Sequence, residues 1–229
     1  VLDCASKMTP LLKPIARTLV AAATLFVAAA SAQAQGVTGD VEAGHKKAEM
    51  CIGCHGIPGY QNSFPEIHKV PKISGQGAPY IVAALKAYQK GDRKHPSMRG
   101  IAGSLSEQDM ADLAAFYAGQ AGPAAPETPA AASAEVAALL QKGACVSCHG
   151  VNFSKPIDPS YPKIGGQHPD YLFVALKSYT VEGNKLIGRS NGIMAGIAKQ
   201  YTPAEMRAIS KYLSTVQGEL QTVPQSRFR

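Results

Sequence analysis

Hydrophobic residues recur with a helical period through much of the chain after residue 40. Two stretches, 79–90 and 170–181, carry apolar residues three and four positions apart, which is the spacing of one face of a helix. These residues are Ile81, Leu85 and Tyr88 in the first stretch and Leu172, Leu176 and Tyr179 in the second. No stretch alternates with period two for long enough to form a strand. The pattern therefore predicts an all-α fold.

Composition and capping signals predict four further helices. Two of these stretches are rich in alanine, and each leads into a pair of cysteines. The other two begin at Ser106 and Thr202, which are each followed three residues later by an acidic residue, a combination that caps the free amides of a helix start. The long segment 56–78 has no helical pattern, and such loops are unusual in a packed domain unless they enclose something. We therefore expect a cofactor. The four predicted helices are 40–51, 133–144, 106–118 and 202–217.

The N-terminal region has the order of a secretory signal peptide. An apolar run of 12 residues, Leu19–Ala30, follows the basic residues Lys13 and Arg17 and precedes an A-x-A sequence that ends at Ala34. A membrane anchor is the alternative, but a spanning helix needs about 20 apolar residues. We expect residues 1–34 to be signal peptide and upstream residues, with cleavage after Ala34 and export to the periplasm.

The rest of the chain consists of one unit that occurs twice. Four sequence blocks appear in the same order in both halves, offset by 91 to 96 residues. A segment with prolines at 123, 126 and 129 separates the halves and cannot continue a helix. The expected domains are 35–122 and 133–229, with a linker over 123–132. The repeated blocks are C-x-x-C-H-G at 51 and 145, P-K-I-x-G-Q at 71 and 162, A-L-K-x-Y at 84 and 175, and M-x-G-I-A at 98 and 194.

The two C-x-x-C-H motifs predict covalently attached haem. Two cysteines at this spacing reach the two vinyl groups of one haem, and the following histidine ligates its iron. A redox dithiol normally occurs once beside a βαβ pattern, and a four-cysteine zinc site would have to join pairs 94 residues apart. A structural disulfide would leave both histidines unexplained. The residues expected to hold two haems are Cys51, Cys54 and His55 in the first domain and Cys145, Cys148 and His149 in the second.

The sixth iron ligands are predicted to be Met98 and Met194. They correspond in the repeat and lie in segments that we expect to be glycine-containing loops, 43 and 45 residues after their histidines. Met110 and Met206 also correspond, but each lies inside a capped helix, where a core position is expected. None of the remaining histidines recurs in both halves, so surface or loop positions are expected for them. They are His45, His68, His95 and His168.

Residues around the ligands are expected to support them. The carbonyl of Pro71 or Pro162 can accept the Nδ1–H of the ligand histidine, which fixes its ring and makes it a better donor. Basic residues gather around both methionines. Most are expected to lie on solvated helix faces, and one or two of them could meet haem carboxylates or an acidic partner. They are Lys86, Lys90, Arg93, Lys94 and Arg99 near Met98, and Lys177, Lys185 and Arg189 before Met194.

Composition and charge narrow the class of protein. Hydrophobic residues make up 45% and charged residues 17%, which is typical of neither a disordered chain nor a polytopic membrane protein. The formal charge of +7 includes no run of five like charges, so nucleic-acid binding is not indicated. Without residues 1–34, the net charge is +1 for 35–124 and +4 for the rest.

The tandem motifs resemble those of the cytochrome c4 family over essentially all of 35–229. The resemblance rests on C-x-x-C-H, P-x-I-x-G-Q, a tyrosine-containing helix and a distal methionine, each present twice. It implies two class I cytochrome c domains that face each other across a pseudo-twofold interface. It further implies a periplasmic protein that passes electrons from respiratory complexes to terminal oxidases, with peripheral contact to membrane complexes.

The expected function is therefore electron transfer without catalysis. With both axial positions of each iron filled, neither substrate nor oxygen can bind, and a thioether ligand raises the reduction potential. One alternative is an electron-transfer subunit of a flavoprotein dehydrogenase of the sulfide dehydrogenase type. A second is a dihaem enzyme of the peroxidase or thiosulfate dehydrogenase type.

Overall fold

The structure is a computed structural model that describes residues 37–224. The predicted signal peptide, residues 1–34, lies outside this range, as does the end of the chain from residue 225. Within the described residues no helix is both long and apolar enough to span a bilayer.

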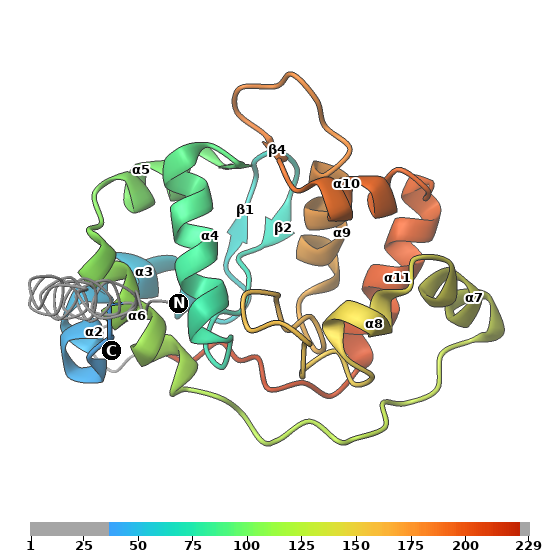
Figure 1. Ribbon diagram of the computed structural model, residues 1–229, viewed down its shortest axis with the longest axis horizontal. Helices are drawn as coiled ribbons and strands as arrows, with labels where there is room; N and C mark the ends of the chain where they lie inside the picture. Colours follow the sequence, from blue (N-terminus) through green and yellow to red (C-terminus); the bar gives the residue numbers. More distant parts are fainter. Residues whose placement is uncertain (1–36, 225–229) are drawn as a thin grey trace, which may run out of the picture. The chain divides into compact units, whose positions relative to one another are not determined.

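Helices dominate the first half of the chain, as predicted (Figure 1). The stretch expected to be one helix over 40–51 is divided at Ala48, so that the cysteine motif has a short helix of its own. Pro96 opens a further short helix over the Met98 segment, and the expectation of a loop there is wrong. The helices are α2 (Val41–Lys47), α3 (Glu49–His55), α4 (Ala78–Lys90), α5 (Pro96–Gly103) and α6 (Glu107–Ala118).

The second half repeats this order. The stretch predicted as one helix over 133–144 ends at Lys142, and Ala144 in the left-handed region (φ 48°) turns the chain into the cysteine helix. The Met194 segment is also a short helix rather than a loop, with the Asn191 side chain accepting the N–H of Met194 at its start. The helices are α7 (Ala134–Lys142), α8 (Cys145–His149), α9 (Pro169–Ser178), α10 (Gly192–Ala198) and α11 (Pro203–Thr215).

Two pairs of two-residue antiparallel strands supplement the helices of the described chain. β1 (Gln61–Asn62) pairs with β2 (His68–Lys69) inside the first half. β3 (Arg93–Lys94) pairs with β4 (Gly188–Arg189), so this ladder joins the two halves. Strands of this length carry no alternating pattern, which is why the sequence did not indicate them.

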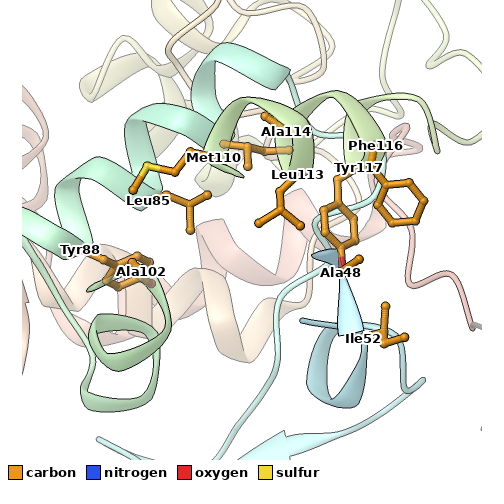
Figure 2. Close-up of a cluster of buried hydrophobic side chains, with 11 residues drawn as sticks. Ala48, Ile52, Leu85, Tyr88, Ala102, Met110, Leu113, Ala114, Phe116 and Tyr117 are labelled. Carbon is orange, nitrogen blue, oxygen red and sulfur yellow. The ribbon is translucent and has the colours of Figure 1, made fainter. Parts of the chain in front are cut away.

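Each half has its own apolar core. Figure 2 shows the first one, in which side chains of α4 and α6 meet those of α3. Met110 is 0% exposed at its centre, and Met206 is 3% exposed in the corresponding core of the second half. The predicted core positions of these two methionines are therefore confirmed. Both predicted capping boxes are also present, at Ser106 with Asp109 and at Thr202 with Glu205.

The two halves contact each other through polar side chains and through the C-terminal segment. Lys177 on α9 pairs with Glu66 at 2.8 Å, and the carboxylate of Asp170 accepts the backbone N–H of Lys69 at 3.0 Å. After α11 the chain returns to the first half, where the N–H of Gln221 donates to the carbonyl of Ser74 at 2.9 Å. The segment between α6 and α7 contains no helix or strand (Figure 1).

Candidate haem sites

The first C-x-x-C-H motif lies on α3 and ends with it. His55 is the last residue of the helix, and its Nδ1 lies 2.8 Å from the carbonyl oxygen of Pro71. Because a carbonyl can only accept, Nδ1 carries the proton, and the Nε2 of a neutral ring keeps its lone pair. The ring is therefore held with its ligating nitrogen available.

The second motif repeats this geometry on α8. The Nδ1 of His149 lies 3.0 Å from the carbonyl oxygen of Pro162. The predicted support of both histidines by these prolines is thus confirmed. Burial lowers the pKa of His55 and of His149, although the hydrogen bond to the proline carbonyl acts in the opposite direction. Both rings are neutral near pH 7, as metal ligation requires.

No disulfide joins the four cysteines of the motifs within the described residues. Cys54 is exposed, and the other three are half-buried. Burial raises the pKa of the Cys51 and Cys145 thiols, so neither is an activated thiolate of the kind that redox enzymes use. Among the described residues no three His, Cys, Asp or Glu side chains gather into a metal site of their own.

Met98 and Met194 occupy equivalent places near the start of α5 and α10. Both side chains are half-buried, in contrast to Met110 and Met206, and Met98 packs against the first apolar core. Their assignment as axial ligands stays a prediction.

The other histidines do not all lie at the surface. His68 is 5% exposed within β2, and its Nδ1 contacts the carbonyl of Glu66 at 2.8 Å, so the expected surface or loop position is wrong for this residue. His68 and His95 lie near each other, with ring centroids 6.5 Å apart. His45 stacks on Phe116, and His168 precedes α9 as its N-cap.

A cluster of arginine and tyrosine side chains lies where β3 meets β4, and sequence reasoning did not single it out. Arg93 donates to the hydroxyl oxygens of Tyr80 at 3.1 Å and Tyr171 at 2.7 Å, and Arg189 donates to Tyr171 at 3.1 Å. Burial alone would raise the pKa of Tyr171, but the two guanidinium charges lower it to about 8. The signal in the sequence is spacing, because each arginine precedes its methionine by five residues.

These arginines also test whether the residues present suit haem. The Nε of Arg93 is buried and has no hydrogen-bond partner, and no carboxylate of the described chain forms an ion pair with either guanidinium. A buried guanidinium N–H without an acceptor is costly, and haem brings two carboxylates of its own. Together with the four cysteines, which form no disulfide with one another, and the neutral, oriented imidazoles, these residues fit one haem in each half.

In the structure, two of the three basic residues that precede Met194 are engaged in contacts within the protein. Lys177 is paired with Glu66, and Arg189 belongs to the arginine–tyrosine cluster. Lys185 is the member of that group that stays exposed without an ion pair. Long-range contacts of this kind are not visible in sequence spacing.

Known proteins resemble this chain in sequence and in fold. The cytochrome c family profile matches residues 41–119 and 133–217. The chain is 33% identical over 182 residues to cytochrome c4 of Pseudomonas aeruginosa, covering 76% of this chain and 88% of that protein. It is 28% identical over 205 residues to the thiosulfate dehydrogenase electron acceptor of Stutzerimonas stutzeri, covering 84% and 92% of the two chains. The structure of reduced recombinant cytochrome c4 from Pseudomonas stutzeri matches with a TM-score of 0.58 at 27% identity, covering 79% of this chain and 100% of that one.

Two tandem cytochrome c domains, each with its own C-x-x-C-H motif, account for both halves of the chain. The all-α prediction and the expectation of two covalently bound haems c are thereby confirmed. With one haem site in each domain and a cytochrome c4 relative across most of its length, the chain belongs to the cytochrome c4 family of dihaem electron-transfer proteins.

Proposed function

We propose that the protein carries single electrons in the periplasm between redox proteins of a respiratory chain, and that a terminal oxidase receives them. In each domain the cysteines would form thioethers with haem, and the histidine and methionine would be the axial ligands of iron. Haem bound in this way supplies a one-electron couple whose reduced state a thioether ligand favours. The residues are Cys51, Cys54, His55 and Met98 in domain 35–122, and Cys145, Cys148, His149 and Met194 in domain 133–229.

The hydrogen bond from each histidine to a proline carbonyl is the observation that carries this proposal. In both domains it leaves Nε2 as the nitrogen with the lone pair. A methionine at the same place in each repeat would fill the opposite side of the iron and leave no position for a substrate. This supports a carrier and argues against a dihaem peroxidase or dehydrogenase.

Arg93 and Arg189 would bind haem carboxylates. Each guanidinium carries several N–H groups in a planar fork, and charge-assisted contacts to carboxylates are the strong hydrogen bonds of proteins. The buried, unpartnered Nε of Arg93 supports this role.

A second candidate function is to accept electrons from one particular dehydrogenase. The similarity to a protein named thiosulfate dehydrogenase electron acceptor supports this possibility. An electron-transfer subunit of a flavoprotein sulfide dehydrogenase is the other form of the same idea. Both differ from a free shuttle in that the protein would remain bound to one enzyme.

Haem content and partner capture test these functions. The pyridine haemochrome assay and intact mass are expected to agree on two haems per chain, and fewer than two would contradict the proposed sites. Pull-down from solubilised membranes, combined with a redox titration, is expected to recover an oxidase at low salt. Recovery of a single dehydrogenase that stays bound at high salt would favour the second candidate.

A further inference from the structure

The interface between the domains contains two reciprocal glutamine contacts. Gln76 and Gln167 occupy the same position in the repeated P-K-I-x-G-Q sequence, and each is 4% exposed. The side-chain oxygen of Gln167 accepts the N–H of Lys72 at 3.0 Å, and its Nε2 donates to the carbonyl of Lys72 at 2.9 Å. Gln76 makes the same two contacts with Lys163, at 2.8 and 3.0 Å. Since a backbone N–H meets only the amide oxygen and a carbonyl only its nitrogen, the orientation of both amides is defined.

The lysines and glycines of the same motif hold these contacts in place. The Nζ of Lys72 donates to the carbonyl of Gly166 at 2.7 Å, and the Nζ of Lys163 donates to the carbonyl of Gly75 at 2.9 Å. Both glycines have positive φ, 84° at Gly75 and 73° at Gly166, a conformation that other residues rarely adopt. The two copies of the motif therefore bind each other through equivalent contacts.

One peptide group connects each glutamine to the haem-site histidine of the opposite domain. The peptide between Pro71 and Lys72 accepts the Nδ1–H of His55 at 2.8 Å and donates its own N–H to Gln167. The peptide between Pro162 and Lys163 lies in the same way between His149 and Gln76.

Hydrogen bonds arranged in such a chain strengthen one another. A peptide whose N–H donates has a more negative carbonyl oxygen, which then accepts more strongly. An imidazole whose Nδ1–H donates more strongly is a better electron donor through Nε2. Contact between the domains thus affects the ligating nitrogen through a single peptide group and requires no conformational change.

We propose that Gln167 and Gln76 are positioning residues that set the donor strength of the axial histidine in the opposite domain. The inference rests on the proposed assignment of His55 and His149 as iron ligands. A stronger imidazole donor favours ferric iron, so the glutamine contact lowers the reduction potential of the haem in the opposite domain. Loss of the contact raises that potential.

The test compares Gln167→Leu and Gln76→Leu as holoproteins, because leucine has similar volume and no acceptor. Gln167→Leu is expected to move the Nδ1–H NMR resonance of His55 upfield in the reduced protein and to leave that of His149 in place. A hydrogen bond changes its neighbour in a chain by roughly 10–30%, so the reduction equilibrium constant of the first haem should rise about twofold to threefold. Gln76→Leu should have the converse effect on His149 and the second haem.

Two further variants separate this role from simple packing. Lys177→Gln breaks the interdomain ion pair with Glu66 and touches neither peptide group, so neither histidine resonance should move. Gln167→Glu loses the donor to the Lys72 carbonyl but keeps an acceptor for the Lys72 N–H, so the His55 resonance should not make the upfield shift expected of Gln167→Leu. It also serves if the leucine variant does not fold.

The outcomes distinguish this inference from the proposed function. If each glutamine variant changes the haem of its own domain, both haems equally, or neither, the inference is wrong. An optical spectrum of two low-spin haems in the same samples would show that the proposed ligands are intact. Loss of low-spin ligation in the unmodified protein would instead contradict the ligand assignment itself.

Discussion

Burial divides the four methionines that correspond in the repeat into two kinds. Met110 and Met206 are 0% and 3% exposed within apolar cores, while Met98 and Met194 are half-buried at the start of short helices. A core thioether contributes packing, because its flexible chain fills irregular space. A half-buried thioether remains available as a donor, which is the role predicted for Met98 and Met194.

Substitution by alanine is expected to separate these two kinds. Met98→Ala and Met194→Ala should each let carbon monoxide bind one ferrous iron and should lower the reduction potential of that domain, as optical spectra and redox titration will show. Met110→Ala and Met206→Ala should cost about 2–5 kcal/mol of unfolding free energy with both haems still low-spin. Carbon monoxide binding to Met110→Ala would show that the ligands are assigned wrongly.

The arginine–tyrosine cluster gives a second prediction for single residues. Arg93→Gln and Arg189→Gln should lower the haem reduction potentials, because removal of a nearby positive charge favours ferric iron. The expected size is about 1 kcal/mol in reduction free energy, as for charges roughly 10–20 Å apart at an effective dielectric constant of about 20. Lys86→Gln, whose partner is the exposed Glu107, is the control and should change neither potential in spectroelectrochemical titration.

In the first domain α2 lies against α6, and the two backbones approach each other closely at Gly44. Gly44 is required there, because a Cβ at this position would lie 2.1 Å from the carbonyl oxygen of Asp112. The buried carboxylate of Asp112 accepts the N–H of Asp40 at 2.8 Å and the Nζ of Lys47 at 2.5 Å. One carboxylate on α6 thus holds both ends of α2. The equivalent position in the second domain is Ala208, so this contact belongs to the first domain alone.

Stability of the first domain should therefore depend on Asp112 and on pH. The hydrogen bond from Asp40, followed by that from Lys47, holds the pKa of Asp112 below its ordinary value of 3.8. Since the folded pKa is depressed, the stabilisation is present above pH 3.8 and is lost as pH falls through the folded pKa. Asp112→Asn should reduce the unfolding free energy at pH 7 by about 1.5–3 kcal/mol.

Denaturant titration at pH 7 and at decreasing pH below 4 will measure this effect. The difference between the variant and the unmodified protein should diminish as the solution becomes more acidic. Ala208→Asn in the second domain is the matched control and should show no such pH dependence. A difference that is constant with pH would mean that packing, and not charge, holds α2 on α6.

At the scale of the whole molecule, the domain interface uses charges that were expected to serve docking. The second half carries the larger positive charge, but Lys177 and Arg189 are engaged between the domains. A transient electron carrier needs rapid encounter and rapid release, so the remaining exposed charges act mainly on the association rate. The expectation that the second domain docks through its positive charge therefore depends on Lys185, in the exposed segment before β4.

Electron transfer to a membrane oxidase should slow as ionic strength rises. The charges of the second domain are screened over about 8 Å at physiological salt, so added salt weakens the electrostatic steering of the partner. Lys185→Glu should reduce the second-order rate constant at low salt by about tenfold, which is within the range of electrostatic steering. Lys46→Glu, on the exposed face of α2, should have a smaller effect in the same stopped-flow measurement. A rate that does not change with salt would indicate apolar docking.

The sequence alone determined the repeat, the longer helices and the covalent haem chemistry. These features are local: C-x-x-C-H places its three functional groups within five residues, and a helix start is encoded by its own capping residues. The proline carbonyls could be predicted as well, because both repeats place them a short distance after the histidine. Met98 and Met194 could be selected by their correspondence, but their short helices could not, since glycine and proline there suggested loops.

Tertiary structure alone decided which residues join the two domains. The glutamine contacts with Lys72 and Lys163 connect residues 95 and 87 positions apart, and each glutamine looks from the sequence like any polar residue before a helix. Arg93 and Arg189 likewise appeared to be surface cations until β3 paired with β4. Such contacts have no local signal, because their energy comes from burial and hydrogen bonding that exist only after the two repeats have packed together.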